Sequence, residues 1–317
     1  AADGSYEDYF AYDVAISGET IVVGAAFDDN VGGTNAGCAY VFVRCDGAWV
    51  QRAQLFHPAP HPEDRFGIGV DVDGDTIAVG AYLDGNACAT ASGSVSVFRR
   101  HDAGTPADPC DDAWQLEPPR LRASMCQVGA AFGFALSLQG DRLLVGAYLE
   151  DSPEADRGAA YVFERSGTTW TETARLLAGD GAASDGLGFS VALDGARALV
   201  GAYRDDAPEG DRGSAHVFDS TSEGWSYTQR LRASDGEAGD QLGVGVALQG
   251  SLALVGAWGN DVNGSSTGAA YLYRLGSGPW IQDQKVTLCD GGPGDEFGTS
   301  LAIAGSTAFI GAHRDDE

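Results

Sequence analysis

Short apolar runs, separated by turns rich in Gly and Asp, dominate the chain. From Phe189 to Leu193, large and small side chains alternate with the two-residue period of a β-strand. Asp194-Gly195 then supplies a two-residue turn, because glycine readily takes the positive φ that such hairpins need. Ala198 to Ala202 follows as an unbroken apolar run, typical of a strand covered on both faces.

Two further strands complete this unit. Gly213 to Phe218 is predicted as a third strand, after an acidic loop. Trp225 to Leu231 alternates aromatic and polar residues, as an outer and half-exposed strand should. Helical periodicity appears nowhere in the chain, so the pattern predicts an all-β protein built from four-stranded antiparallel units.

The unit recurs along the chain with a fixed spacing of about 55 residues. A Phe-Gly or Leu-Gly pair opens the first strand, and a Gly-Ala pair closes the second. The glycines of the Gly-Ala pairs are Gly24, Gly80, Gly146, Gly201, Gly256 and Gly311. The steps between them are 56, 66, 55, 55 and 55 residues, and the long step comes from an insertion around His101 to Asp112. Radial repetition of such sheets predicts a β-propeller, which protects the sheet edges.

We therefore interpret residues 1–317 as a single β-propeller domain. Residues 1–8 match only the last loop of a repeat. Five complete repeats span 9–65, 66–131, 132–186, 187–241 and 242–296, and the first two strands of a sixth span 297–317. Because a closed ring needs its last blade completed, we expect a full ring of six or seven blades, with the absent strands supplied by further residues or by another chain.

The Phe-Gly and Gly-Ala pairs resemble the FG-GAP repeat, known from the integrin α-chain propeller and from many secreted microbial proteins. The resemblance covers nearly the whole chain and implies the propeller fold. Integrin-type repeats that bind calcium insert an Asp-x-Asp-x-Asp-Gly loop between the first two strands. The corresponding turns are tight here, so that calcium site is not carried over to this chain. Asp71, Asp73 and Asp75 have part of the spacing, but a strand and a turn account for them better.

The charge balance narrows the classes of partner. There are 46 acidic and 19 basic residues, which gives a formal net charge of -27. Such a surface repels phosphate backbones and anionic lipids, so we expect neither nucleic-acid binding nor membrane-surface binding. No apolar run approaches the roughly 18 residues that a membrane helix needs, so we expect no direct membrane insertion. Cations or a basic partner fit this charge better.

Strand alternation predicts that the loops after the second and fourth strands emerge at one end of each sheet. Most of the loop carboxylates belong to these loops: Asp28, Asp29, Glu150, Asp151, Asp156, Asp205, Asp206, Asp211, Asp261, Asp315, Asp316, Asp180, Asp185, Asp235, Asp240, Asp290 and Asp295. Such carboxylates either hold Ca²⁺ through several oxygens or satisfy loop backbone N–H groups. The cluster that best fits a metal site is Asp205, Asp206 and Asp211, with Asp151 and Asp156 one repeat earlier. The family resemblance implies that ligands bind at this end.

Aromatic residues border the same end. The residue after each Gly-Ala pair is Tyr82, Tyr148, Tyr203, Trp258 or His313, and Arg204 follows Tyr203. These side chains either contact a ligand, such as a sugar or a partner side chain, or pack between neighbouring blades. Both interpretations stay open at this point.

Six cysteines in an acidic chain with a single lysine predict disulfides and an oxidising compartment. The predicted topology pairs Cys45 with Cys110, and Cys88 with Cys126. Cys38 and Cys289 would bond only if ring closure brought them together. In addition, Asn263 begins an Asn-Gly-Ser glycosylation sequon.

Catalytic motifs are absent from the sequence. It contains no Gly-x-Ser-x-Gly elbow and no phosphate-binding loop, and its five histidines lack zinc-site spacing. We therefore expect a non-catalytic module, secreted or on the cell surface, that binds a protein or glycan through its acidic end and serves adhesion. The alternative is a building block of an extracellular filament or matrix, in which a neighbouring copy completes the last blade.

Overall fold

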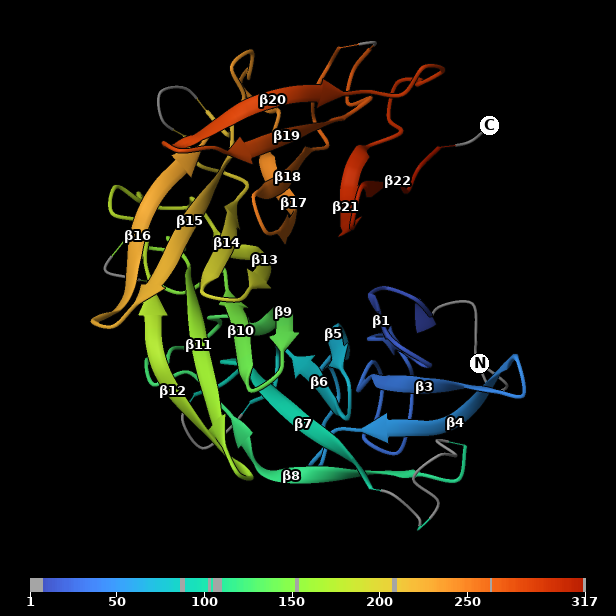
Figure 1. Ribbon diagram of the computed structural model, residues 1–317. Helices are drawn as coiled ribbons and strands as arrows, with labels where there is room; N and C mark the ends of the chain where they lie inside the picture. Colours follow the sequence, from blue (N-terminus) through green and yellow to red (C-terminus); the bar gives the residue numbers. More distant parts are fainter. Residues whose placement is uncertain are drawn as a thin grey trace. The chain divides into compact units, whose positions relative to one another are not determined.

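The computed structural model describes residues 8–85, 89–101, 104, 110–151, 154–206, 210–262 and 264–315. In these ranges the secondary structure consists of β-strands, labelled β1 to β22 in Figure 1, and no helix longer than one residue occurs. None of the described segments forms a helix long and apolar enough to cross a membrane. The predicted all-β class is confirmed.

Within the described ranges, five sheets contain four strands each, in chain order, and a sixth sheet contains two (Figure 1). The first three sheets are β1 (Val14–Ser17), β2 (Thr20–Ala25), β3 (Cys38–Cys45) and β4 (Ala48–Phe56); β5 (Phe66–Asp73), β6 (Thr76–Ala81), β7 (Ser94–His101) and β8 (Ala113–Leu121); and β9 (Phe132–Gln139), β10 (Arg142–Ala147), β11 (Ala159–Ser166) and β12 (Thr169–Leu176). The others are β13 (Leu187–Asp194), β14 (Arg197–Ala202), β15 (Ser214–Thr221) and β16 (Gly224–Leu231); β17 (Leu242–Gln249), β18 (Leu252–Ala257), β19 (Ala269–Leu275) and β20 (Trp280–Val286); and β21 (Phe297–Ala304) with β22 (Thr307–Ala312).

The strand register fixes which loops share an end of a sheet. In the fourth repeat, Asp194 pairs with Arg197 across a tight turn, while Leu187 pairs with Ala202 at the other end of the same two strands. Ala202 also pairs with Ser214, at the end where the second-to-third loop emerges. The loops after the second and fourth strands therefore lie at one end of each sheet, as predicted. We call this end the loop end, and the opposite one the hairpin end.

The chain divides into two compact units. The first comprises Ala1–Val145 with Phe163–Glu172, and the second comprises Gly146–Val162 with Thr173–Glu317. Each unit has an apolar core between adjacent sheets. In the first, Phe66 of β5 packs with residues of the first two sheets. In the second, Leu242 of β17 packs with residues of the fourth and fifth sheets. The residue that opens each of these first strands is therefore a core residue.

The spacing of the glycines is explained by contact between neighbouring sheets. A Cβ atom built on Gly80 of β6 would lie 1.9 Å from the carbonyl oxygen of Gly133 in β9. The same closeness recurs between Gly201 and Gly243, where the distance would be 2.0 Å. The Gly-Ala glycine of one repeat thus lies against the Phe-Gly or Leu-Gly glycine of the next. Any side chain there would push the sheets apart.

We expect Gly80→Ala to destabilise the protein by more than about 4 kcal/mol, because backbone must move to admit the methyl group. The matched control is Gly74→Asn in the β5–β6 turn. Gly74 has φ +55° and no atom within 4 Å of a built Cβ, and asparagine tolerates that conformation. It should cost about 1 kcal/mol or less. Urea unfolding measures both variants, and equal losses would contradict the packing explanation.

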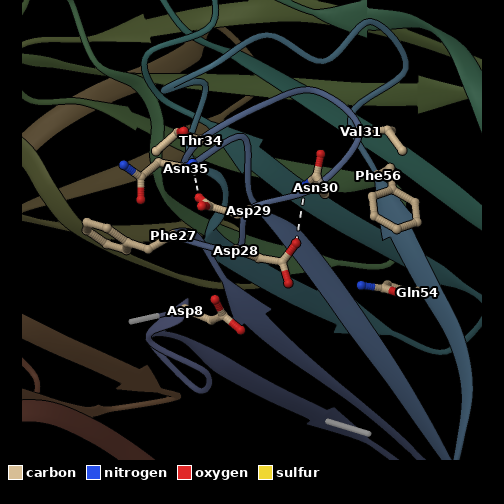
Figure 2. Close-up of a pocket in the computed structure, with 10 residues that line it drawn as sticks. All are labelled: Asp8, Phe27, Asp28, Asp29, Asn30, Val31, Thr34, Asn35, Gln54 and Phe56. Carbon is tan, nitrogen blue, oxygen red and sulfur yellow. Dashed lines mark hydrogen bonds between the residues drawn. The ribbon is translucent and has the colours of Figure 1, made fainter. Parts of the chain in front are cut away.

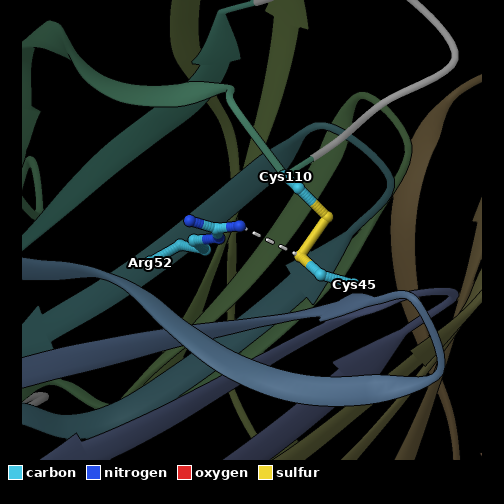
Figure 3. Close-up of a disulfide and its surroundings, with 3 residues drawn as sticks. All are labelled: Cys45, Arg52 and Cys110. Atoms are coloured by element: carbon cyan, nitrogen blue, oxygen red, sulfur yellow. Dashed lines mark hydrogen bonds between the residues drawn. A yellow bond between two sulfur atoms is a disulfide. The ribbon is translucent and has the colours of Figure 1, made fainter.

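One predicted disulfide is confirmed. Cys45, at the end of β3, bonds Cys110, which lies 65 residues later and precedes β8 (Figure 3). Cys126 is disulfide-bonded, and its predicted partner Cys88 lies outside the described residues. Cys38 and Cys289 are free thiols and do not bond each other. Burial raises the pKa of the Cys38 thiol to about 12, so this cysteine stays protonated at neutral pH.

Replacing Cys45 and Cys110 together by serine should lower the free energy of unfolding by about 2–4 kcal/mol, because the unfolded chain gains the freedom of the opened loop. Cys289→Ser is the control, since Cys289 is exposed and free. Denaturant unfolding without reductant checks both. A double variant as stable as the control would contradict a stabilising role for this crosslink.

Candidate functional site

Each loop that follows a second strand carries an acidic or amide residue four positions after the Gly-Ala glycine. In the first five repeats these residues are Asp28, Asp84, Glu150, Asp205 and Asn260, and all five are buried. Sequence reasoning placed Asp28, Glu150 and Asp205 in the loops of this end as candidate surface carboxylates, and their burial corrects that expectation. The side chains turn inward because partners on the third and fourth strands reach them.

Arginines of the fourth strand neutralise three of these buried acids. Arg120 Nη1 of β8 donates to Asp84 Oδ2 at 2.8 Å, and Arg230 Nη1 of β16 donates to Asp205 Oδ2 at 2.9 Å. In the third repeat, Arg175 donates through Nε to Glu150 Oε1 at 2.9 Å. Burying a carboxylate costs solvation free energy unless the group is paired and hydrogen-bonded. These arginines therefore offset the cost of burying the three acids.

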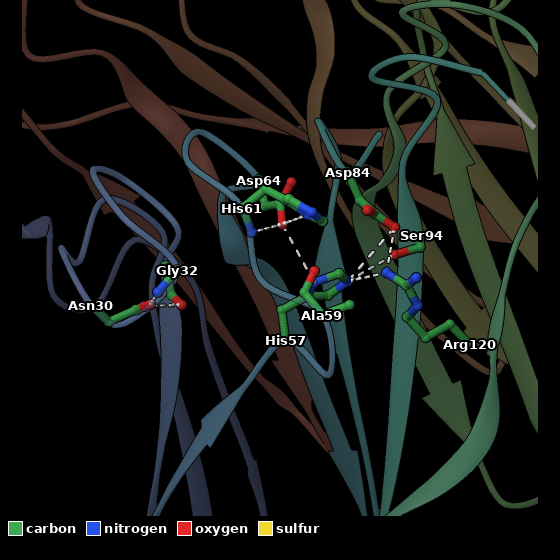
Figure 4. Close-up of polar contacts among 10 residues, drawn as sticks. Asn30, Gly32, His57, Ala59, His61, Asp64, Asp84, Ser94 and Arg120 are labelled. Carbon is green, nitrogen blue, oxygen red and sulfur yellow. Dashed lines mark hydrogen bonds and ion pairs between the residues drawn. The ribbon is translucent and has the colours of Figure 1, made fainter. Parts of the chain in front are cut away.

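A histidine from the loop after β4 joins the ion pair of Asp84 and Arg120. His57 lies between Asp64 and Asp84, with Nδ1 3.4 Å from Asp64 Oδ2 and Nε2 3.6 Å from Asp84 Oδ2 (Figure 4). One ligand atom from each of these three residues lies within 4.8 Å of the others, as in a metal site. However, Arg120 Nη1 lies only 2.6 Å from His57 Nε2 and therefore places a positive charge within the cluster. The donor set does not fit a metal while Arg120 remains there.

The predicted metal-binding cluster is divided by the structure. Asp205 is 2% exposed and pairs with Arg230, whereas Asp206 is exposed. Asp206 Oδ1 accepts the backbone N–H of Asp211 at 2.8 Å. The counterpart in the third repeat is Asp151 Oδ1, which accepts the N–H of Asp156 at 3.0 Å.

These contacts support the alternative in which loop aspartates hold the loop backbone. The same bond joins Asp29 to Asn35 at 2.7 Å and Asp261 to Ser266 at 2.7 Å. Calcium binding at Asp206 and Asp211, or at Asp151 and Asp156, stays a prediction.

The aromatic residues after the Gly-Ala pairs contact neighbouring strands. Tyr148 and Phe189 have ring centroids 5.3 Å apart, and Phe189 also lies 4.2 Å from Tyr203. Tyr82 contacts Phe134 at 5.6 Å. Trp258 donates its indole N–H to Gln241. This geometry favours packing as their main role.

The two remaining residues of the predicted ligand-binding set lie beside charged or aromatic groups. The guanidinium of Arg204 lies 4.9 Å from the ring centroid of Tyr203. His313 Nε2 lies 3.2 Å from Glu296 Oε2. Asn263 and Asp316, two other predicted positions, lie outside the described residues.

Asp71 and Asp73, whose spacing is similar to part of a calcium loop, bind backbone instead. Asp71 Oδ2 accepts the N–H of Leu138 at 2.6 Å, and Asp73 Oδ2 accepts the N–H of Gly140 at 2.6 Å. Leu138 lies in β9 of the next sheet, and Gly140 lies in the turn that follows β9. The strand-and-turn interpretation is supported, and its purpose is to join neighbouring hairpins.

A pocket of about 450 Å³ opens at the loop end of the first repeat. Figure 2 shows its lining residues: Asp8, Phe27, Asp28, Asp29, Asn30, Val31, Thr34, Asn35, Gln54 and Phe56. Sequence reasoning missed this pocket. A signal was present, since aligning the fourth strands places Gln54 where later repeats have Arg120, Arg175 and Arg230.

Similarity to known proteins agrees with this geometry. A family model described as the FG-GAP repeat matches residues 1–42, 49–98, 117–163, 170–218, 225–273 and 280–317. The chain belongs to the FG-GAP repeat family. No curated protein matches the chain. The two glycines that give the FG-GAP repeat its name are those that meet between neighbouring sheets.

The raised pKa of the Asp71 carboxyl should make the stability of the protein depend on pH. Burial raises its pKa to about 7, against about 3.9 in an unfolded chain. The folded state therefore binds more protons than the unfolded state between these values, and stability falls as pH rises through this window. Where Asp71 is fully protonated in the folded state and fully ionised in the unfolded state, the unfolding free energy falls by about 1.4 kcal/mol per pH unit.

We expect Asp71→Asn to flatten the fall in unfolding free energy between pH 4.5 and 7, because asparagine does not titrate. Staying above pH 4.5 avoids Asp84 and Asp235, whose pKa values are lowered. Asp46→Asn, at an exposed turn, is the control and should leave the slope unchanged. Identical slopes for Asp71→Asn and the wild type would exclude this origin of the pH dependence.

Proposed function

We propose that this FG-GAP chain is an extracellular, non-catalytic binding module that recognises a protein or glycan through its loop end and serves adhesion. The carrying observation is the contrast between the two ends of each sheet. An exposed aspartate recurs at one position of the loops after the second strands in four repeats, whereas only two residues separate the first strand of each sheet from the second. We further propose that the sheets are blades of one ring, so that the loops of successive repeats form one surface.

Four equivalent aspartates define that surface. Asp29, Asp151, Asp206 and Asp261 are exposed, and each accepts a backbone N–H of its own loop. Because each carboxylate accepts a backbone N–H of its own loop, its position in that loop is fixed. Fixed polar groups favour binding because less conformational freedom is lost when the ligand arrives.

An extracellular location is supported by two features. FG-GAP repeats are typical of extracellular proteins, and the Cys45–Cys110 disulfide fits an oxidising compartment. The non-catalytic assignment rests on the sequence, which lacks nucleophile and phosphate-loop motifs. We keep calcium as a proposed aid to binding at the loop end.

Arrays of glycans and of extracellular proteins, read with calcium and with EDTA, test this proposal. The variant changes Asp29, Asp151, Asp206 and Asp261 to asparagine, which keeps an oxygen for each loop N–H. We expect at least tenfold weaker binding to the targets that the wild type captures, because four carboxylates are lost from the proposed surface.

The control changes an equal number of exposed acids at the hairpin end to amides: Glu19, Asp46, Asp75 and Glu223. It removes the same charge and should bind like the wild type. Equal binding by both variants, or no captured target, would contradict recognition through the loop end. Binding that EDTA removes and calcium restores would support the metal prediction separately.

A further inference from the structure

The fourth strand holds a basic residue at one repeated position. Cross-strand register places Arg230 of β16 opposite His216, and Lys285 of β20 opposite Tyr271. The same register places Gln54 of β4 opposite Tyr40. Gln54 is therefore the first-repeat equivalent of the arginines that neutralise Asp84, Glu150 and Asp205.

The first repeat keeps the buried acid but has a neutral residue at this position. Asp28 is 6% exposed, and it accepts hydrogen bonds from the Tyr40 hydroxyl and from Asn30 Nδ2, both at 3.3 Å. Gln54 Nε2 donates to the Tyr40 hydroxyl at 3.1 Å. In the fifth repeat, by contrast, the acid itself is replaced by Asn260, so no arginine is needed there.

The electrostatic consequence differs between the two repeats. Burial raises the pKa of Asp28, with a further rise from the nearby charge of Asp8. Burial also acts on Asp84, but hydrogen bonds from His57 and Ser94 and the charges of His57 and Arg120 outweigh it and lower its pKa. The first repeat therefore presents a carboxylate that a positive charge would stabilise.

The space needed for that charge is present. The pocket of about 450 Å³ lies beside Gln54, and Figure 2 shows Asp8, Asp28 and Gln54 around it. Phe27 and Phe56 supply apolar walls for the methylene groups of a long side chain. The guanidinium of Arg65 lies over the ring of Phe27, 3.9 Å from its centroid, and its Nη2 pairs with Glu63 Oε2 at 2.6 Å. The charge of Arg65 is therefore paired with a carboxylate other than Asp28.

We propose that the first-repeat pocket binds the guanidinium or ammonium group of an arginine or lysine side chain from a partner protein. The incoming group occupies the place that Arg120, Arg175 and Arg230 occupy in their own repeats, and pairs with Asp28. This inference rests on the proposed binding function and names the chemistry of one contact. A guanidinium is favoured because it forms paired hydrogen bonds to a carboxylate in a planar geometry.

Binding of a short peptide tests the proposal. The probe is acetyl-Ala-Arg-Ala-amide, and its matched control replaces arginine by citrulline, which has nearly the same shape but no charge. Titration followed by nuclear magnetic resonance should show binding of the arginine peptide and at least tenfold weaker binding of the citrulline peptide. Added salt should weaken the arginine complex, because the contact is ionic.

Gln54→Arg is the decisive variant. It restores the arginine of the other repeats, so it should fill the pocket, keep the fold and weaken the arginine peptide at least tenfold. Asp28→Asn should weaken it similarly by removing the carboxylate. Asp46→Asn, at the hairpin end, removes one exposed charge elsewhere and should leave the affinity unchanged.

The outcomes separate this inference from the proposed function. Unchanged binding in Gln54→Arg, equal binding of the citrulline peptide, or displacement of the arginine peptide by stoichiometric Ca²⁺ would each overturn the inference. If Gln54→Arg still captures the array targets of the wild type while the four-aspartate variant does not, recognition at the loop end stands without this pocket.

Discussion

The close approach of two glycine backbones between adjacent sheets is the constraint on which the structure depends. A built Cβ on Gly24, Gly80, Gly146, Gly201 or Gly256 would lie 1.8–2.0 Å from a carbonyl oxygen of the following sheet. Because the backbones meet there without side chains, the opening residue of the next first strand enters the core. Four strands and their connections take about 55 residues, and this length separates each glycine contact from the equivalent contact in the next repeat.

The two ends of each sheet differ in how they connect to neighbouring sheets. The two-residue turns between first and second strands join neighbouring sheets through bonds from side chain to backbone, as when the Asp73 carboxylate accepts the N–H of Gly140. The longer loops at the opposite end are free to differ, and there the repeats vary in charge and in size. Loops positioned by a rigid scaffold are a common location for binding residues. The fold therefore keeps the repeated strands and turns separate from the variable loops, which are the part available for binding a ligand.

Charge compensation inside the loop end links the fold to the proposed function. A buried acid requires a partner, and Arg120, Arg175 and Arg230 provide it within their own repeats. Where an aspartate follows the buried acid in these loops, it is exposed to solvent. In the first repeat, Gln54 carries no charge to pair with Asp28, and the pocket beside it has room for a group from another molecule. One substitution in a repeated strand is enough to change an internal ion pair into a candidate binding pocket.

The sequence by itself determined the strands, their order, the repeat length, the family and the Cys45–Cys110 pairing. These follow from local periodicity and from spacing, and both are visible along the chain. Burial of Asp28, Asp84, Glu150 and Asp205 was decided only by the tertiary structure, because it depends on cross-strand register that brings Arg or Gln of the fourth strand to the loop. The same holds for the inward packing of Tyr148 and Tyr203, since an aromatic residue reads alike in sequence whether it faces solvent or a neighbouring sheet.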